Sequence, residues 1–561
     1  MEKSRPTIES PAATGDRSSF SLKHAIVVAL LGFVLAVLVQ WKTGAWKDDF
    51  SATGDETSHF TSAVAMSRYL MSTHILAPYR FASQYYLHYP KVAFGKWPPL
   101  FHLLSGIWFL IFPPSRFAAV LFIAVQTAVL GVVAFWVASR LLPHLLASLA
   151  AIAVVVSPFF MMHSTIFMTE PQLATLGLLA IMALLNFLEG GSWKSGLAFV
   201  IAATACVLTK ANGWAVLLSA GAGYLWLRKD TRTSVFQVTV VLLLVVLLCV
   251  PFYYFFVRAM SDGNSYSKPT FQFTREVLPT YLKESFYALG AAISVLFLLG
   301  ILLCFRRGFR QQPHRCAIVL LITWIAGPFV FQLIIPASFE VRHLAIAFPC
   351  VVLLAFVAIE SLLGRFGQRV VLCAGAATVL LTVPWTMAAR YSDLFQIAAP
   401  RIVSDLSHSA NKAVLISSNG LGEGRMVASM LALDPQTRFI CVRATKLLAD
   451  SNWGASDYHL LARTKEDVLN KLDGVPVSYA AVHEIARRKG LPHWALLREA
   501  LLSSPERWHI SSVINSFSTE EGSETLTIFV NSANLTKAVK QLDVDMRRKL
   551  GLIFELQHPG E

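Results

Sequence analysis

The chain has 561 residues, of which 55% are hydrophobic and 15% charged, and its mean hydropathy is +0.55. This composition excludes a soluble globular protein and is typical of a polytopic membrane protein. The formal net charge of +14 does not indicate a nucleic-acid partner, because the basic residues stand at the ends of apolar runs and do not gather on one polar face.

The N-terminal part predicts a tail followed by a membrane anchor. Residues 1–22 are polar and rich in Ser, Pro and Thr, so we expect a disordered cytoplasmic tail. The apolar run after Lys23 is followed by WKTGAWKDD and not by the small residues of a cleavage site, which predicts a retained anchor with its N-terminus inside. Six of the seven cysteines lie in apolar runs, so Cys441 has no partner for a disulfide in the C-terminal part.

Apolar runs long enough to cross about 30 Å of hydrocarbon recur from Lys23 to Trp385 and then stop. We predict that they form a transmembrane module over residues 23–389 with about eleven helices. The predicted spans are 24–40, 117–139, 144–161, 171–188, 195–209, 212–227, 235–257, 286–305, 316–336, 343–363 and 369–388.

The segment Pro98–Phe112 decides the topology. If it crossed the membrane, the basic loops at 228–232 and 306–315 would lie outside, against the preference of Lys and Arg for the cytoplasmic side. It is also short for a span, and it begins beside a lysine and a tryptophan, which anchor interfacial helices. We therefore predict interfacial helices within a first extracytoplasmic loop over residues 41–116.

This topology places many ionisable residues on the extracytoplasmic side. Such groups are costly to desolvate at membrane ends and would be scattered if they served only solubility, so their convergence indicates a functional site. They are Asp55, Glu56, His59, Lys96, His102, His163, Glu170, Lys210, Glu340, Arg342 and His343.

The acidic pair near the first span has structural alternatives. Thr53-x-x-Glu56 matches a capping box, in which Glu56 satisfies backbone amides at the start of a helix. Asp55 can be a solvated carboxylate in the same first turn, stabilised by the helix dipole.

The other candidates also have structural alternatives. Lys96 can extend to lipid headgroups, and Glu170, which precedes a proline, can cap a helix. Glu340 and Arg342 can form a surface ion pair of little energetic value.

Five sequence elements occur in order along the membrane half. An acidic pair follows the first span in GDETSHF, FGKWPPLFHLL enters the interfacial helix, SPFFMMHSTIFMTEP ends near Glu170, VLTKANG contains Lys210, and EVRHLAIAFP contains Arg342. Together they resemble the C-type (GT-C) membrane glycosyltransferases that use polyprenyl-phosphate sugars, above all the aminoarabinose transferases of lipid A and the protein O-mannosyltransferases. In that family the interfacial helix also lies on the outer face.

Two positions depart from the pattern of that family. Trp97 separates Lys96 from the prolines, so the lysine stands one position away from its expected place. Gly95 occupies a position where the aminoarabinose transferases have a glutamate that helps hold a metal. No cofactor is therefore required, although a divalent metal between Glu56 and His59 is possible because i and i+3 share a helical face.

The resemblance implies an inverting transfer of a sugar from a polyprenyl-phosphate donor to a lipid, glycan or protein acceptor. It implies an acidic catalytic group of Asp55, Glu56 and Glu170, in which Asp55 is the general base. The donor phosphate is then expected to be held by the cations Lys96, Lys210, Arg342 and His343.

The two remaining segments are predicted from composition. The outer loop 258–285 has aromatics between polar residues, which permits a mobile cover for the donor or a simple connector. From residue 390 to 561, short apolar runs alternate with amphipathic stretches, which predicts an extracytoplasmic α/β domain with a mainly parallel sheet.

Two other functions remain open from the sequence. A flippase or transporter of lipid-linked glycans would place ionisable residues within spans and show related halves, whereas the charges here cluster at one membrane face. An oligosaccharide ligase or polymerase with a pyrophosphate-linked donor differs only in its donor. Whichever of these functions it has, the chain is expected to be integral to the plasma (inner) membrane.

Overall fold

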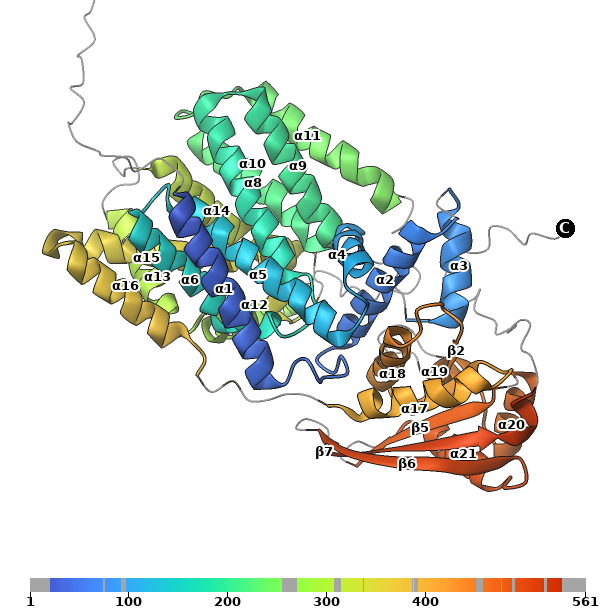
Figure 1. Cartoon of the computed structure of the whole chain (residues 1–561). Coiled ribbons are helices and arrows are strands. Elements are labelled where there is room, and N and C mark those ends of the chain that lie inside the picture. Colours follow the sequence, from blue (N-terminus) through green and yellow to red (C-terminus); the bar gives the residue numbers. More distant parts are fainter. Residues whose placement is uncertain are drawn as a thin grey trace, which may run out of the picture.

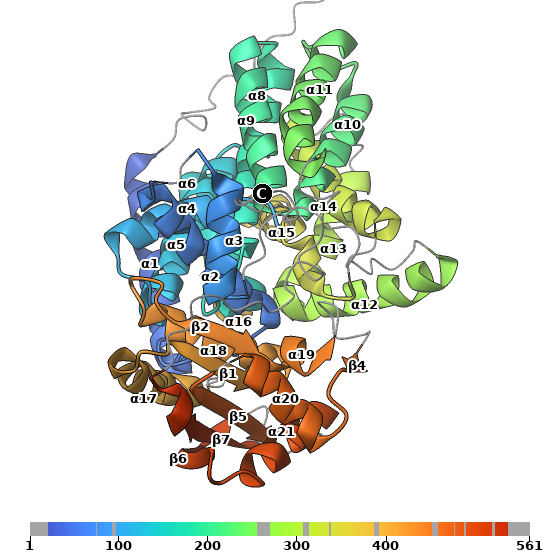
Figure 2. The same ribbon diagram turned by 90° about the vertical axis from the view of Figure 1, so that its right-hand side faces the viewer.

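The computed structural model has two parts, a helical bundle and a C-terminal sheet with its covering helices (Figure 1). The helices α2 and α3 lie between these parts in both views (Figures 1 and 2). Lys96, the first twenty residues and part of the predicted cover loop fall outside the described residues. The structure describes residues 21–73, 76–91, 97–254, 270–306, 314–335, 338–385, 387, 392–450, 458–475, 477–486, 490–518 and 522–536.

The bundle packs Ala, Val, Leu and Phe side chains of several helices into one continuous core. Serine caps begin three of its described helices, since Ser115 accepts a hydrogen bond from Ala118 N, Ser192 accepts one from Lys194 N, and Ser234 forms a capping box with Gln237. The helices are α1 Leu22–Thr43, α4 Leu100–Ile111, α5 Arg116–Ala138, α6 His144–Val156, α7 Pro158–His163, α8 Glu170–Gly190, α9 Trp193–Thr209, η1 Ala211–Trp214, α10 Ala215–Leu227, α11 Val235–Phe252, α12 Phe271–Leu289, α13 Ala291–Arg306, α14 Arg315–Ile334, η5 Val341–Leu344, α15 Ala347–Leu363, η6 Gly364–Phe366 and α16 Gln368–Thr382.

Every predicted span contains a helix. In the described part of the chain, six helices are long and apolar enough to cross a membrane, and a bent pair formed by α12 and α13 makes a possible seventh. Shorter apolar helices occupy other predicted spans, among them α6, α9 and α16. The chain is thus a helical membrane protein, while the number of eleven crossings stays a prediction.

The first predicted loop folds into α2 (Gly54–Met71), α3 (Pro78–His88) and α4. The helix α4 has twelve residues and a length of about 18 Å, which is too short to cross about 30 Å of hydrocarbon. It packs mainly against α2. These features agree with an interfacial helix.

The C-terminal region, defined here as residues 392–536, contains a five-stranded sheet in the order β2-β1-β5-β7-β6. On β1, Val414 and Ile416 belong to the cluster of α17 and α18, while Ala413 and Leu415 belong to that of α20 and α21, so helices cover both faces. The elements are α17 Leu394–His408, β1 Ala413–Ser417, α18 Gly420–Ala432, β2 Ile440–Arg443, α19 Ala444–Leu447, β3 Ala449–Asp450, β4 His459–Leu460, α20 Lys465–Gly474, β5 Tyr479–Ile485, α21 Pro492–Leu502, β6 Trp508–Ser518, β7 Gly522–Asn531 and η7 Ser532–Asn534.

The sheet is mixed, so the expectation of a mainly parallel sheet is corrected. β1 pairs in parallel with β2 and β5, but β7 pairs antiparallel with both β5 and β6. Only three residues separate β6 from β7. A parallel pair needs a crossover of about a dozen residues, so this connection permits only a hairpin.

Candidate active site

The acidic pair stands in the first turn of α2. Thr53 is the N-cap, and its hydroxyl accepts a hydrogen bond from Glu56 N, as the sequence predicted. The reciprocal half of the capping box does not form, because the carboxyl group of Glu56 binds other partners. Asp55 and Glu56 are consecutive on a helix, so their side chains point in directions about 100° apart.

Asp55 forms an ion pair with Arg342, which lies in η5 near the start of α15. The distance from Arg342 Nη2 to Asp55 Oδ2 is 2.8 Å, and the same guanidinium binds Glu340. The side chains of Asp55 and Arg342 are 25% and 17% exposed, so solvent reaches this pair. The sequence predicted the Glu340–Arg342 pair, but not the contact with a residue 287 positions earlier.

Glu170 forms a second ion pair, with Lys210. Lys210 Nζ lies 2.6 Å from Glu170 Oε1, and the lysine is 16% exposed while the carboxylate is enclosed. Glu170 Oε2 is buried without a hydrogen-bond partner among the described residues. Lys210 thus presents the accessible side of this pair.

The two ion pairs lie within electrostatic range of each other. Burial lowers the pKa of Arg342, but the charges of Glu170, Asp55 and Glu340 outweigh it, so the pKa stands above its usual value. The pKa of His163 lies below its usual value, mainly because the ring is buried. The charge of Glu170 opposes this shift, while the charges of Lys210 and Arg342 add to it. Residues from five segments of the chain therefore form one charged cluster.

His343 is held by the protein on both ring nitrogens. Asn212 Nδ2 lies 2.8 Å from His343 Nδ1, and Ser338 Oγ lies 2.8 Å from His343 Nε2. The side chain is buried, and both of its ring nitrogens are bound within the protein. The geometry favours a residue that shapes the η5 turn over a cation that binds phosphate.

Glu56 faces a different group from Asp55. Its Oε1 accepts a hydrogen bond from Phe167 N at 2.7 Å and binds the guanidinium of Arg116. Arg116 also contacts Asp48 at 3.4 Å and donates to two backbone carbonyls. Burial raises the pKa of the Glu56 carboxyl, and the positive charge of Arg116 opposes that rise.

His59 lies one turn further along α2, in an aromatic cluster. Its Nδ1 is 2.9 Å from His102 Nε2, and its ring stacks on Trp97 at 4.1 Å. Burial lowers the pKa of both histidines, that of His102 to about 4. Neither is therefore a cation at neutral pH.

The expected metal pair of Glu56 and His59 gains no third ligand. Among the described residues, no group of three or more His, Cys, Asp or Glu is placed to hold a metal ion. Glu56 is bound to Arg116 and His59 to His102. The donor set of Glu56 and His59 therefore does not fit a metal ion.

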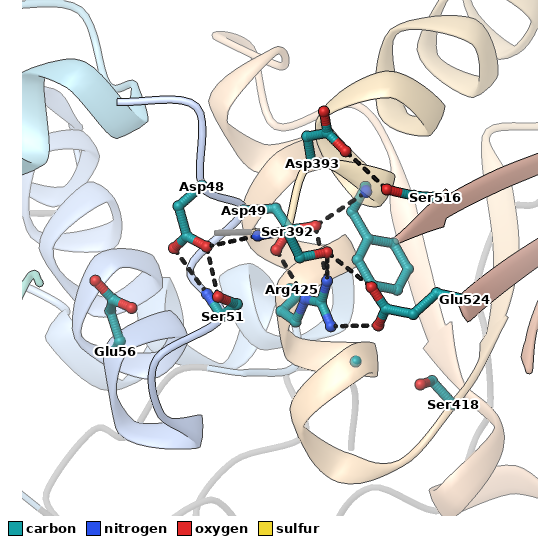
Figure 3. A network of polar contacts seen from close by, with 12 residues as sticks. Asp48, Asp49, Ser51, Glu56, Ser392, Asp393, Ser418, Arg425, Ser516 and Glu524 are labelled. Carbon is teal, nitrogen blue, oxygen red and sulfur yellow. Dashed lines mark hydrogen bonds and ion pairs between the residues drawn. The ribbon is translucent and has the colours of Figure 1, made fainter. Parts of the chain in front are cut away.

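A second buried arginine, which sequence reasoning missed, joins the first loop to the C-terminal region. Arg425 on α18 binds Asp49 through two hydrogen bonds of 2.8 and 3.0 Å and contacts Glu524 on β7 at 3.1 Å (Figure 3). Its guanidinium lies 4.7 Å from the ring of Phe395. The only sequence signal is the WKDDF segment, whose acidic residues lie just after a span.

The C-terminal region packs directly on the helix that carries Asp55. A Cβ atom added at Gly424 on α18 would lie 2.6 Å from Thr57 Oγ1 and 2.8 Å from Lys91 Cε, so only glycine permits this approach. Phe60 and Ala63 of α2 share one hydrophobic cluster with Met426 and Val427 of α18. Tyr89 donates to Asp434 at 2.6 Å across the same contact.

Comparisons with known proteins show which sequences and structures this chain is similar to. Residues 96–255, less than a third of the chain, match the family of dolichyl-phosphate-mannose-protein mannosyltransferases. The structure is similar to ArnT from Cupriavidus metallidurans bound to undecaprenyl phosphate, with a TM-score of 0.52, 14% identity and coverage of 92% of this chain and 100% of that chain. No curated protein sequence matches.

Oligosaccharyltransferases are similar as well. For the apo enzyme of Archaeoglobus fulgidus the TM-score is 0.54 at 10% identity, with 82% of this chain and 69% of that chain covered. For AglB of the same organism, in complex with an inhibitory peptide and a dolichol-phosphate, the TM-score is 0.54 at 10% identity, with 91% and 74% covered.

The chain has the C-type glycosyltransferase fold. The predicted resemblance is thereby confirmed. The family match includes Arg116, Glu170 and Lys210, but it ends before Arg342 and begins after Asp55. The roles of individual residues therefore depend on the geometry described above.

Proposed function

We propose that this chain is an inverting glycosyltransferase that moves a sugar from a polyprenyl-phosphate donor to an extracytoplasmic acceptor. The observation that carries the proposal is the accessible pair of Asp55 and Arg342 beside Lys210. It combines a carboxylate that can take a proton with two cations that can bind a phosphate. ArnT, with the same fold, is bound to undecaprenyl phosphate.

The chemistry is a single displacement. Asp55 accepts the proton of the acceptor hydroxyl, whose oxygen forms a bond to the anomeric carbon of the sugar. The bond from that carbon to the phosphate oxygen breaks, and polyprenyl phosphate leaves with the electron pair. Arg342 and Lys210 stabilise the charge that develops on the phosphate.

The two ion pairs in the free protein are compatible with this role. A donor phosphate would compete with Asp55 for the guanidinium of Arg342, and its binding would release a carboxylate oxygen for the acceptor proton. Glu170 would hold Lys210 in place from its enclosed position. Lys96 is also proposed to contact the phosphate.

Glu56 is proposed as a positioning residue. Its enclosed carboxylate and the guanidinium of Arg116 fix the start of α2 against the start of α5 and the segment before α8. This contact sets the place of the neighbouring Asp55 without touching a substrate.

The orientation in the membrane follows from the charge of the loops. With the N-terminus in the cytoplasm, the short basic loops lie inside, and the cluster around Asp55 lies outside. Residues 390–561 are then extracytoplasmic, and α18 of the C-terminal region covers α2 from the aqueous side. Labelling of cysteines introduced at the accessible positions 55 and 340 from outside intact cells would test this placement, and labelling of only one of them would contradict it.

The function is tested with purified protein in lipid vesicles. We expect transfer from a polyprenyl-phosphate sugar and none from the corresponding pyrophosphate-linked donor. Transfer from the pyrophosphate-linked donor alone would favour the alternative function of an oligosaccharide ligase or polymerase. The structural similarity to an oligosaccharyltransferase is the observation that supports this alternative. Mass spectrometry of envelope lipids, glycans and proteins from cells with and without the chain would identify the acceptor.

A further inference from the structure

The helix α12 does not continue the direction of the membrane helix that follows it. α12 and α13 meet at Gly290, which has a φ of +83°, and their axes are bent by 114°. Since α13 is apolar and lies in the bundle, α12 must run across the membrane end of the bundle. Figure 2 shows α12 lying crosswise to α8, α9 and α10.

The side chains of α12 divide into three faces. Phe273, Val277 and Tyr281, four residues apart, are buried against the protein. A second face is apolar but exposed, and a third face about 100° away is polar. The exposed apolar face consists of Phe271, Leu278, Leu282 and Phe286, which are 84, 38, 58 and 44% exposed, and the exposed Arg275 stands among them near the start of the helix. The polar face consists of Gln272, Glu276 and Lys283.

We propose that the exposed apolar face of α12 lies in the outer leaflet of the bilayer. A helix with one face on protein, one apolar face and one polar face suits the boundary between protein, lipid and water. The apolar exposure continues along α13, where Val295, Leu298 and Leu302 are 52, 65 and 49% exposed. Because α13 meets lipid with these residues, the perpendicular helix before it meets the same lipid surface.

Contact with the bilayer would fix the depth in the membrane of the η5 turn, which carries Arg342. Tyr281 donates a hydrogen bond of 2.6 Å to the carbonyl of Ser338, and the ring of Phe273 lies 5.4 Å from that of Phe339. Ser338 in turn binds His343, the neighbour of Arg342. The buried face of α12 thus supports the segment that carries Arg342, while its apolar face rests on lipid.

Spin labels on adjacent faces test the proposal. The exposed Cys373 is first replaced by Ser, and a nitroxide is then attached in Leu282→Cys and, as a matched control, in Lys283→Cys. In vesicles of phosphatidylethanolamine and phosphatidylglycerol, we expect the label at 282 to collide more often with oxygen than with a water-soluble nickel complex. The label at 283 should show the opposite order.

Three results would overturn the proposal. Equal access of the nickel complex at both positions would place α12 in water. Dipolar broadening between labels at 282 would show that a second copy of the chain covers this face. The protein can also be transferred with detergent from the vesicles into a soluble polymer scaffold that contains no lipid. If the oxygen collisions of the label at 282 do not change on this transfer, lipid contact is excluded. None of these measurements depends on sugar transfer, so they stand apart from the test of the proposed function.

Discussion

Two kinds of ion pair surround α2, and they differ in their access to solvent. The side chains of Arg116 and Arg425 are 3% and 2% exposed and are enclosed by carboxylates and backbone groups of the protein. Those of Arg342 and Lys210 are 17% and 16% exposed. An enclosed guanidinium has no room for a ligand, so it holds the structure, whereas an accessible cation can exchange a carboxylate for a phosphate.

The largest expected effect comes from the accessible pair. Asp55→Asn should reduce the initial rate of sugar transfer by about 10²–10⁴-fold, the usual contribution of a general base. Because Asp55 is partly exposed, the free energy of unfolding should change by only about 0.5 kcal/mol. Glu340→Gln, which removes the other carboxylate on the same guanidinium, is the matched control and should retain most of the rate. Undiminished transfer by a folded Asp55→Asn protein would refute the base assignment.

The next effect comes from the enclosed pair. Arg425→Met leaves Asp49 and Glu524 without their partner, and loss of one member of a buried pair lowers the free energy of unfolding by about 3–5 kcal/mol. Arg498→Met breaks a pair with Glu484 in which the two side chains are 48% and 46% exposed, and it should cost less than about 1 kcal/mol. Unfolding in detergent, followed by circular dichroism, measures both. Equal effects would show that the Arg425 network does not hold the two parts together.

A smaller effect tests the contact between α18 and α2. Gly424→Ala inserts a methyl group against Thr57 and Lys91, and such overpacking costs about 1–3 kcal/mol. We expect transfer to fall as well, because α2 shifts with Asp55. Gly420→Ala on the same helix meets nothing within 4 Å and serves as the control. Identical rates for the two variants would argue against a positioning role for the C-terminal region.

The last prediction concerns the pH dependence of stability. Burial raises the pKa of Asp49 from 3.8 to about 7, against the opposing charge of Arg425. The folded state then binds more protons than the unfolded state between these values, so the contribution of Asp49 to stability declines as the pH rises from about 4 to 7. Asp49→Asn should flatten this decline in melting temperatures measured across the same range. Parallel profiles for both proteins would contradict the assignment.

The sequence predicted the features that depend on local pattern. Apolar length located the helices of the bundle, and the Thr53-x-x-Glu56 spacing located the cap of α2. The ionisable residues predicted to lie on the extracytoplasmic side include Asp55 and Arg342, and also Glu170 and Lys210. The structure brings each of these two pairs together.

Pairings between distant segments could not be predicted in the same way. Glu56 fits a local cap in the sequence, but Arg116, sixty residues later, takes its carboxylate. Hydropathy marks Arg116 only as the start of a span, and the spacing of strands did not reveal that β7 runs antiparallel to β5. Both outcomes depend on tertiary packing, which outweighs local preference.

The clasp between Asp49 and Arg425 has a consequence for biogenesis, since 376 positions separate the two residues. Asp49 leaves the ribosome just after the first span, and Arg425 leaves it only after the last one has been made. Chains are synthesised from the N-terminus, so every intervening helix can be inserted before this contact closes. Until then the loop after the first span lacks this polar anchor, and a truncated or stalled chain would carry an incompletely fixed α2.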